Sequence, residues 1–299
     1  MSINEKSKIS IGLPVYNGEK FIEKRLESIL SQSYTNFELI ISDNRSTDLT
    51  YEICKEYEKK DQRIRLIRQQ NNIQAILNFN FVLNEAKNDY FVWASVDDLW
   101  DRTFLEKNIK YLENNNECVC SISKVEKYGE DNHDFEISKK DNLITKKYKK
   151  MRNYFRPFEI FSLDGNYVQR AKKFLDNPSA LIFYGIYRTK DLKRSIIDKP
   201  ILALDWIIIL NVLEFGYINV LNETLFKYNT KGASSRGLIN QFKKDLIPLS
   251  DLIFPYYSFF NYSLKKFGVS FVISNFRRFF TLYLGGIISN IKEVFMTNK

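Results

Sequence analysis

Strand-like and helix-like segments alternate through the first 120 residues, and this alternation constrains the fold more than any other feature of the chain. Four apolar runs rich in β-branched and aromatic residues predict buried strands, at 8–14, 37–42, 64–67 and 90–96. Three segments with helical spacing separate these strands. The first is 20–32, the second runs from a cap at Ser46, Thr47 or Asp48 to about Lys60, and the third is 73–86. Repeated units of this size predict parallel strands joined by right-handed crossovers, and therefore a doubly wound α/β sheet.

The residues that leave these strands are expected to meet, because the carboxyl ends of parallel strands share the edge where such sheets bind ligands. The polar or aromatic residues at these ends are Pro14, Tyr16 and Asn17 after the first strand, Asp43 after the second, and Asp97 with Asp98 after the fourth. Asp97 and Asp98 close the apolar run that starts at Tyr90, so we expect both carboxylates to emerge together.

The chain lacks the glycine-rich turns that commonly bind phosphate, since no G-x-G and no G-x-x-x-x-G-K sequence occurs. The charge of a phosphorylated ligand would then be met by Mg²⁺ or Mn²⁺ held by Asp97 and Asp98. Tyr16 offers an aromatic face to a base, and Asp43 can accept hydrogen bonds from a base or ribose. Paired aspartates in a loop are more often a helix cap or a solvated turn, so this prediction depends on their position.

The net charge of +9 belongs to the second half of the chain. Residues 1–120 contain 16 Lys and Arg against 19 Asp and Glu, whereas residues 121–299 contain 29 against 17. A basic half can face nucleic acid, an anionic membrane or a phosphorylated substrate. The basic stretch 139–156 interleaves few aromatic residues with its lysines, and we therefore expect no nucleic-acid partner.

The segments after residue 120 are less regular. Residues 181–187 have strand character, and a helix is predicted from Asp205 through Leu213. Residues 251–299 are dense in aromatics, but Lys265, Lys266, Arg277 and Arg278 interrupt every apolar run before it could span a membrane. An amphipathic surface helix is expected there, which packs on the rest of the protein, contacts another subunit or lies on a membrane.

The cysteine content indicates a reducing compartment. Cys54, Cys118 and Cys120 are too few for a disulfide framework, and no apolar signal peptide precedes the first strand, so we expect a cytoplasmic protein. Cys118 and Cys120 share one strand face, yet two thiols without further Cys or His residues fall short of a zinc site.

The strand ends and their flanking residues resemble family 2 glycosyltransferases of the GT-A fold. The resemblance is carried by 14–17 (PVYN), 31–44 (SQSYTNFELIISDN) and 46–48 (STD), and weaker matches follow at 75–79, 184–188 and 204–207. It implies a Rossmann-like, mostly parallel sheet with three parts: a nucleotide-sugar-binding half at 1–120, an acceptor-binding half at 121–250, and a helical extension at 251–299.

The resemblance also implies roles for single residues. Pro14, Tyr16, Asn17, Asp43 and Asn78 would line the pocket for a nucleotide sugar, by resemblance a UDP sugar. Asp97 aligns with the metal-binding aspartate that ends the D-x-D motif. Many relatives have an acid where this chain has Ser95, with Val96 between, so the metal contacts would fall on Asp97 and Asp98.

Asp205 matches the general base that opens a helix in the acceptor-binding half of this family, although relatives often have an acid where Leu204 stands. Lys231 and Arg236 lie where relatives carry a mobile loop, and could reach the diphosphate or form a solvated turn. His133 lies in a polar stretch and is expected at the surface.

The leading hypothesis is a metal-dependent, inverting transferase of surface polysaccharide or glycolipid assembly, peripheral on the inner face of the cell membrane. Its donor would be a nucleotide sugar and its acceptor a saccharide or lipid-linked saccharide. The alternatives are a nucleotidyltransferase and a non-catalytic nucleotide-sugar-binding subunit whose D-x-D motif has decayed at Ser95.

Overall fold

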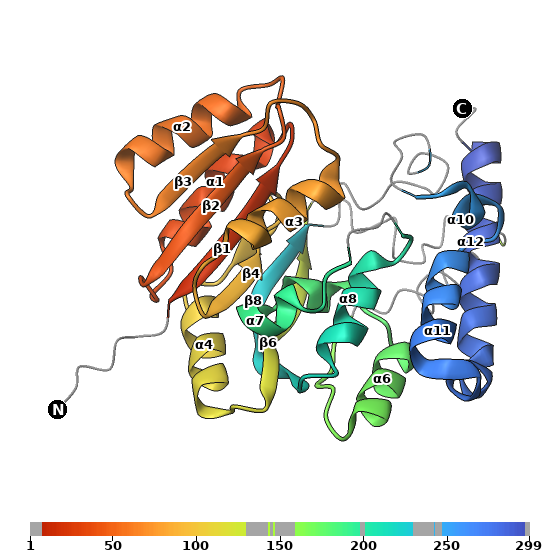
Figure 1. The fold of residues 1–299 in the computed structure, drawn as a ribbon. Coiled ribbons are helices and arrows are strands. Elements are labelled where there is room, and N and C mark those ends of the chain that lie inside the picture. Colours follow the sequence, from red (N-terminus) through yellow and green to blue (C-terminus); the bar gives the residue numbers. More distant parts are fainter. Residues whose placement is uncertain are drawn as a thin grey trace.

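The computed structural model describes residues 8–129, 143, 146, 159–197, 201–229, 242 and 247–296. These residues form an eight-stranded mixed sheet with helices on both faces (Figure 1). The strands stand in the order β3-β2-β1-β4-β7-β6-β8-β5. Their bounds are β1 (Ile9–Val15), β2 (Phe37–Asp43), β3 (Ile64–Arg68), β4 (Tyr90–Trp93), β5 (Leu99–Trp100), β6 (Cys118–Tyr128), β7 (Ile186–Arg188) and β8 (Tyr217–Asn229).

The first half of the sheet is parallel, as the sequence predicts. β1 pairs in parallel with both β2 and β4, and β2 pairs with β3, with Val15 opposite Asp43. The connecting helices are α1 (Glu19–Leu30), α2 (Thr50–Lys60) and α3 (Ala75–Glu85). Because the strand order reverses between β1 and β4, the loops after these two strands flank the switch point where doubly wound sheets bind ligands.

The second half of the sheet mixes directions. β7 is antiparallel to β4 and β6, β5 is antiparallel to β8, and β6 is parallel to β8. One sheet therefore joins strands from both sides of residue 120. The helices of this half are α4 (Phe104–Asn114), α6 (Tyr167–Asp176), α7 (Thr189–Lys193) and α8 (Leu204–Val212).

Two sequence predictions differ from the structure. The strand expected at 90–96 ends at Trp93, and the strand expected at 181–187 begins with a 3₁₀ helix, η2 (Ala180–Tyr184), before β7. The two regions contact each other, since the buried Trp93 ring stacks on Phe183 of η2 with centroids 4.1 Å apart. An apolar run does not by itself distinguish a strand from such a turn.

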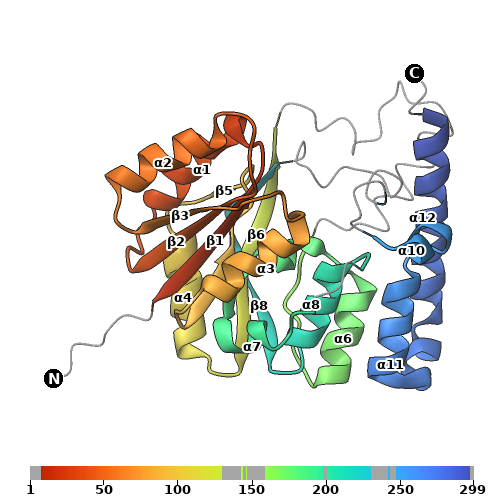
Figure 2. The same ribbon diagram turned by 45° about the horizontal axis from the view of Figure 1, so that its top comes forward.

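The C-terminal part is helical, as expected. It contains α10 (Leu249–Ile253), α11 (Tyr257–Ser274) and α12 (Phe276–Met296), and the last two form a hairpin that stands beside α6 and α8 (Figures 1 and 2). The Trp206 ring of α8 joins this part to the rest of the protein, since it packs against the rings of Phe174, Tyr256 and Phe259. No helix within the described ranges is both long and apolar enough to cross a membrane.

Candidate functional site

Asp97 and Asp98 lie in the turn between β4 and β5, and their environments differ. Asp97 is partly exposed, and its Oδ1 accepts a hydrogen bond from the Ser95 hydroxyl. Asp98 is buried, and its Oδ1 accepts a hydrogen bond of 2.9 Å from the backbone N–H of Asn229. The expectation that both carboxylates emerge together is therefore wrong, because the chain turns after Trp93 and directs only one of them outward.

Burial perturbs Asp98 strongly. It raises the pKa of this carboxyl to about 7, and the negative charge of Asp97 acts in the same direction. The hydrogen bond from Asn229 and the positive charge of Arg25 oppose the shift. A titratable group perturbed in this way next to a strand end is typical of functional sites.

The distant strands β6 and β8 brace this turn. The Tyr128 hydroxyl at the end of β6 donates a hydrogen bond to the backbone carbonyl of Asp97, and Asn229 at the end of β8 holds Asp98. β5 also pairs with β8, with Leu99 opposite Lys227. Sequence reasoning missed Tyr128 and Asn229 because no local pattern reveals partners more than thirty residues away.

Arg25 of α1 lies behind the same turn and was also missed. Its side chain is fully buried, and its three guanidinium nitrogens make no hydrogen bond with the described residues. Asp98 and Asp97 attract its charge, while burial lowers its pKa to about 10. The helical spacing of α1 assigns this position to the apolar face, and that spacing was the available signal that a charge is buried there.

The loop after β1 carries Tyr16 and Asn17 to the same edge of the sheet. Tyr16 is 48% exposed, so its ring is available for stacking. Asn17 has a positive φ of 50°, and its Oδ1 accepts a hydrogen bond of 2.9 Å from the Thr47 N–H. A Cβ added to Gly18 would lie 2.8 Å from the Val96 side chain, so this loop packs against the turn that holds Asp97.

Asp43 is also at this edge, but its carboxylate is already bonded. It is fully buried, accepts a hydrogen bond from the Ser46 N–H at 3.2 Å, and forms an ion pair with Arg68 at 3.3 Å. The Arg68 guanidinium in turn lies over the Tyr51 ring, 4.1 Å from its centroid. A base that Asp43 recognised would have to share this carboxylate with Ser46 and Arg68 or replace one of them.

Pro14 and Asn78 are the other residues that the sequence assigns to the nucleotide pocket. Pro14 is buried within β1. Asn78 is buried in α3, where its amide accepts a hydrogen bond of 2.5 Å from the Ser42 hydroxyl and donates one of 3.0 Å to the Ser42 carbonyl. In this structure Asn78 joins α3 to β2.

Asp205 lies in the first turn of α8, as the sequence predicts. The residue before this helix, Ala203, has a left-handed conformation with φ of 64°. Asp205 shares a neighbour with the strand-end acids, because Asp98, Asp97 and Asp205 all act with burial to raise the pKa of Tyr184 well above its usual value. Tyr184 ends η2, so this 3₁₀ helix links the turn after β4 with the start of α8.

Lys231, Arg236 and His133 lie outside the described residues, and so does nearly all of the basic stretch 139–156. Their predicted roles stay predictions. The last described residue before this loop is Asn229, whose backbone N–H donates a hydrogen bond to Asp98.

Asp97 fits a divalent cation whose remaining ligands a phosphorylated ligand would supply. No cluster of three or more His, Cys, Asp or Glu side chains suited to a metal occurs among the described residues. Mg²⁺ in such sites needs only one or two carboxylates, because substrate phosphates supply further oxygen ligands. Asp97 meets this requirement, since its Oδ2 accepts no hydrogen bond from any described residue.

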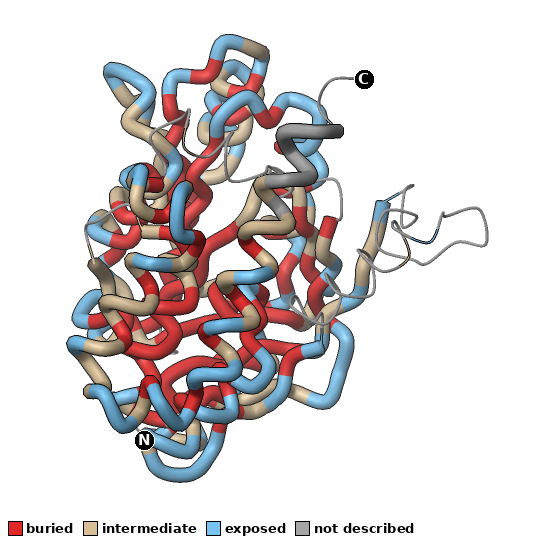
Figure 3. The backbone as a smooth tube through the Cα atoms, turned by 90° about the vertical axis from the view of Figure 1, so that its right-hand side faces the viewer, coloured by how far each residue is buried: buried red, intermediate tan, exposed pale blue. Residues whose placement is uncertain are grey.

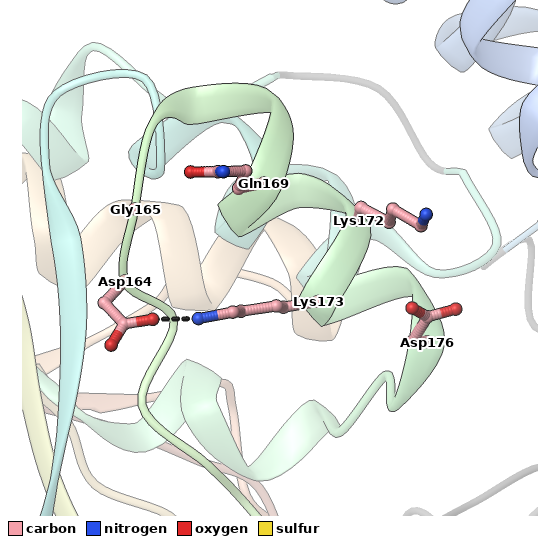
Figure 4. Close-up of a pocket in the computed structure, with 6 residues that line it drawn as sticks. All are labelled: Asp164, Gly165, Gln169, Lys172, Lys173 and Asp176. Atoms are coloured by element: carbon pink, nitrogen blue, oxygen red, sulfur yellow. Dashed lines mark hydrogen bonds and ion pairs between the residues drawn. The ribbon is translucent and has the colours of Figure 1, made fainter.

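A separate hollow of about 360 Å³ lies at α6. Its lining is Asp164, Gly165, Gln169, Lys172, Lys173 and Asp176 (Figure 4). Lys173 and Asp164 form an ion pair across it, and both side chains are more than half exposed. None of the residues predicted for the site lines this hollow.

Comparison with known proteins identifies relatives for the first part of the chain. Residues 10–189 match the model of the family described as glycosyl transferase family 2. EpsE of Bacillus subtilis is 39% identical over 112 residues, which are 37% of this chain and 40% of EpsE. TuaG of the same organism is 36% identical over 109 residues, 36% of this chain and 43% of TuaG. The names of both assign them provisionally to the glycosyltransferases, and that of TuaG adds teichuronic acid biosynthesis.

Solved structures share the fold over more of the chain. Residues 1–349 of TarS from S. aureus, in complex with UDP-GlcNAc, superimpose with a TM-score of 0.60 at 18% identity, covering 80% of this chain and 64% of that one. The mannosyltransferase PcManGT from Pyrobaculum calidifontis, in complex with GDP-Man and Mn²⁺, gives a TM-score of 0.54 at 14% identity, covering 98% and 88%.

Proposed function

The chain belongs to glycosyl transferase family 2, and from this premise we propose that it transfers a sugar from a nucleotide-diphosphate donor to an acceptor hydroxyl. The observation that carries the proposal is the placement of three acids: Asp97 and Asp98 lie in the turn after β4, Asp205 lies in the first turn of α8, and η2 packs against both elements. Acids for metal binding and a separate acid for proton transfer are the groups that such a reaction needs.

The proposed donor is a nucleotide sugar, with UDP as the leading candidate. The complexes of TarS with UDP-GlcNAc and of PcManGT with GDP-Man support this class of donor. The exposed Tyr16 ring would stack on the base, and Asp43 would accept a hydrogen bond from the nucleoside in exchange for Ser46 or Arg68. Pro14, Asn17 and Asn78 would support the pocket from β1, its loop and α3, and Lys231 and Arg236 would bind the diphosphate.

Mg²⁺ or Mn²⁺ is the proposed cofactor, and Asp97 would hold it with Asp98 behind. When bound, such a cation supplies positive charge that stabilises the departing diphosphate. Ser95 orients Asp97 by hydrogen bonding to Oδ1, which leaves Oδ2 for the metal. Asp98 contributes from its buried position, where Asn229 fixes its orientation.

Asp205 is the proposed general base. Its carboxylate would take the proton from the acceptor hydroxyl while that oxygen forms a bond to the anomeric carbon. The bond from this carbon to the diphosphate oxygen breaks at the same time, and its electron pair leaves with the nucleoside diphosphate. Attack from the face opposite the leaving group inverts the anomeric configuration.

The proposed acceptor is a saccharide or a lipid-linked saccharide of surface polysaccharide assembly. The name of TuaG, which specifies teichuronic acid biosynthesis, supports this class. The three cysteines are free and buried, which agrees with the cytoplasmic location that we propose for the reaction.

Donor binding and turnover can be tested separately. A panel of nucleotide sugars with Mn²⁺ is screened by thermal shift, since a ligand that binds the folded state raises its melting temperature. Release of nucleoside diphosphate is then measured with the selected donor and with oligosaccharide or lipid-linked acceptors. Asp205→Asn should keep the melting shift and lose turnover by about a hundredfold or more, because the proton acceptor is removed.

Asp191→Asn is the matched control, because Asp191 also lies in the first turn of a helix, α7. This variant should turn over normally. Near-normal turnover in Asp205→Asn would reject the assignment of the base. Donor binding without hydrolysis or transfer, with Mn²⁺ and with EDTA, would instead favour the non-catalytic subunit.

A further inference from the structure

The hairpin of α11 and α12 has an inner and an outer side with different chemistry. On the inner side Phe259, Val272, Phe279 and Leu282 are buried. The outer side carries an apolar stripe, which we define as Val269, Ile273, Phe276, Phe280 and Leu284. Each of these side chains is 40% exposed or more, and Ile273 reaches 68%. Figure 3 views the molecule from the hairpin side and shows exposed and buried segments alternating along it.

The stripe is continuous along α12. Phe276, Phe280 and Leu284 follow one another at intervals of four residues, which places them on one face of the helix. The rings of Phe276 and Phe280 stack with centroids 5.9 Å apart. Val269 and Ile273 extend the apolar surface into the piece of α11 that follows the kink at Gly268.

The cations of the hairpin divide in the same way. Lys266 and Arg278 form ion pairs with the α/β body, at 3.1 Å to Glu214 and 3.4 Å to Asp176. Lys265 and Arg277 are exposed and form no ion pair with any described residue. Residues 252–290 contain no Asp or Glu. The outer side therefore combines exposed aromatics with unpaired positive charge.

We propose that this outer side is a docking surface for an anionic membrane, on which the hairpin lies with α12 parallel to the bilayer. Exposed Phe and Leu side chains enter the interfacial region, and Lys265 and Arg277 meet anionic headgroups. No described helix is both long and apolar enough to span a bilayer.

A second copy of this chain fits the surface less well. A two-fold contact brings the same patch of both subunits together. The positive charge of Lys265 and Arg277 on one copy would then be brought close to that on the other, with no acid on residues 252–290 to offset the repulsion. An anionic surface complements both the charge and the apolar character of the stripe.

The test is sedimentation of the full chain with vesicles, either of zwitterionic lipid alone or with about one third anionic phosphatidylglycerol, a composition that gives a strongly negative surface. Binding should require the anionic lipid. Phe276→Ser with Phe280→Ser, and separately Lys265→Glu with Arg277→Glu, should each lower the bound fraction roughly tenfold. Circular dichroism and the melting temperature verify that each variant is folded.

A matched charge control is Lys59→Glu with Lys110→Glu. Both lysines are exposed, on α2 and α4, across the molecule from the hairpin (Figure 1), and the change in net charge is the same. This control should retain binding. Absence of vesicle binding, or equal loss in the control and the Lys265/Arg277 variant, would overturn the proposal. A concentration-dependent dimer that the Phe276/Phe280 change dissociates, without vesicle binding, would replace it with self-association. None of these readouts depends on sugar transfer.

Discussion

The guanidinium carbon of Arg25 lies 3.9 Å from the centroid of the Trp100 ring. This contact is a cation–π interaction inside the protein, since Arg25 is fully buried and Trp100 is 5% exposed. The ring gives the charge a favourable neighbour but no hydrogen-bond acceptor. Arg25 is therefore held by an aromatic face and by the more distant charge of Asp98.

We expect Arg25→Met to leave the free energy of unfolding unchanged or to raise it by about 1 kcal/mol. The fall in the Arg25 pKa from its usual value to about 10, caused by burial, corresponds to a cost of about 3 kcal/mol for the buried charge. A desolvated cation–π contact offsets about 2 kcal/mol of this, and the methionine stem keeps most of the packing. Urea unfolding measures the difference.

Arg25→Ala provides the contrast to that substitution. It removes the stem as well as the charge, and the cavity should lower the free energy of unfolding by about 3 kcal/mol. A loss of about 3 kcal/mol or more in Arg25→Met, the usual range for breaking a buried pair, would mean that the guanidinium has a stabilising partner.

The pKa of Asp98 predicts a pH dependence of stability in the metal-free protein. A carboxyl with a pKa of about 7 when folded and 3.8 when unfolded binds more protons in the folded state between these values. The contribution of Asp98 to the free energy of unfolding is therefore fully present below about pH 4 and is lost as the pH rises through about 7. The total loss is at most about 4 kcal/mol. Asp98→Asn should flatten this slope in urea unfolding with EDTA, whereas Asp191→Asn should retain it.

Ser95 and Asp97 predict opposite changes in Mn²⁺ affinity. Asp97→Asn removes the accessible carboxylate and should weaken Mn²⁺ binding at least about tenfold, measured by calorimetry with UDP present. Ser95→Asp adds a carboxylate beside Asp97 and should strengthen it by a similar factor, because hard cations gain affinity with each charged oxygen ligand. Unchanged Mn²⁺ affinity in both variants would place the cation elsewhere.

The three cysteines should be unreactive while the protein is folded. Burial raises the pKa of Cys54 to about 12 and of Cys118 to about 11, and raises that of Cys120 well above its usual value. At pH 8 the thiolate fraction of Cys54 should be about a thousandfold lower than that of an exposed thiol. Ellman's reagent should therefore label all three only in guanidinium, and rapid labelling of the native chain would contradict these environments.

The parallel half of the sheet could be predicted from sequence because each element has its own local signal. The strands β1, β2 and β3 and the helices α1, α2 and α3 agree with the predicted segments within a few residues. The end of β4 was not predicted, and its last residue, Trp93, contacts Phe183, ninety residues further on. Local periodicity contains no information about such a contact.

The positions of the candidate acids in the fold could be predicted, but the residues that support them could not. The positions of Asp97, Asp98 and Asp205 follow from strand and helix ends. Their different exposure does not, because the backbone of Asn229 and the hydroxyl of Tyr128 hold the turn from the other half of the chain. Asn78 and Asp43 are predicted to contact the ligand, but in the structure both side chains are buried and hydrogen-bonded to other residues of the protein.

The pairing of β5 with β8 limits how this chain could be recombined with other members of its family. A chimaera that joined residues 1–120 to a foreign second half would need a strand that pairs with Leu99 and an N–H that meets Asp98. Without them Asp97 and Asp98 would lose their support even though every residue of the first half were retained. Exchange of loops and helices in the second half would disturb this turn less than replacement of β8.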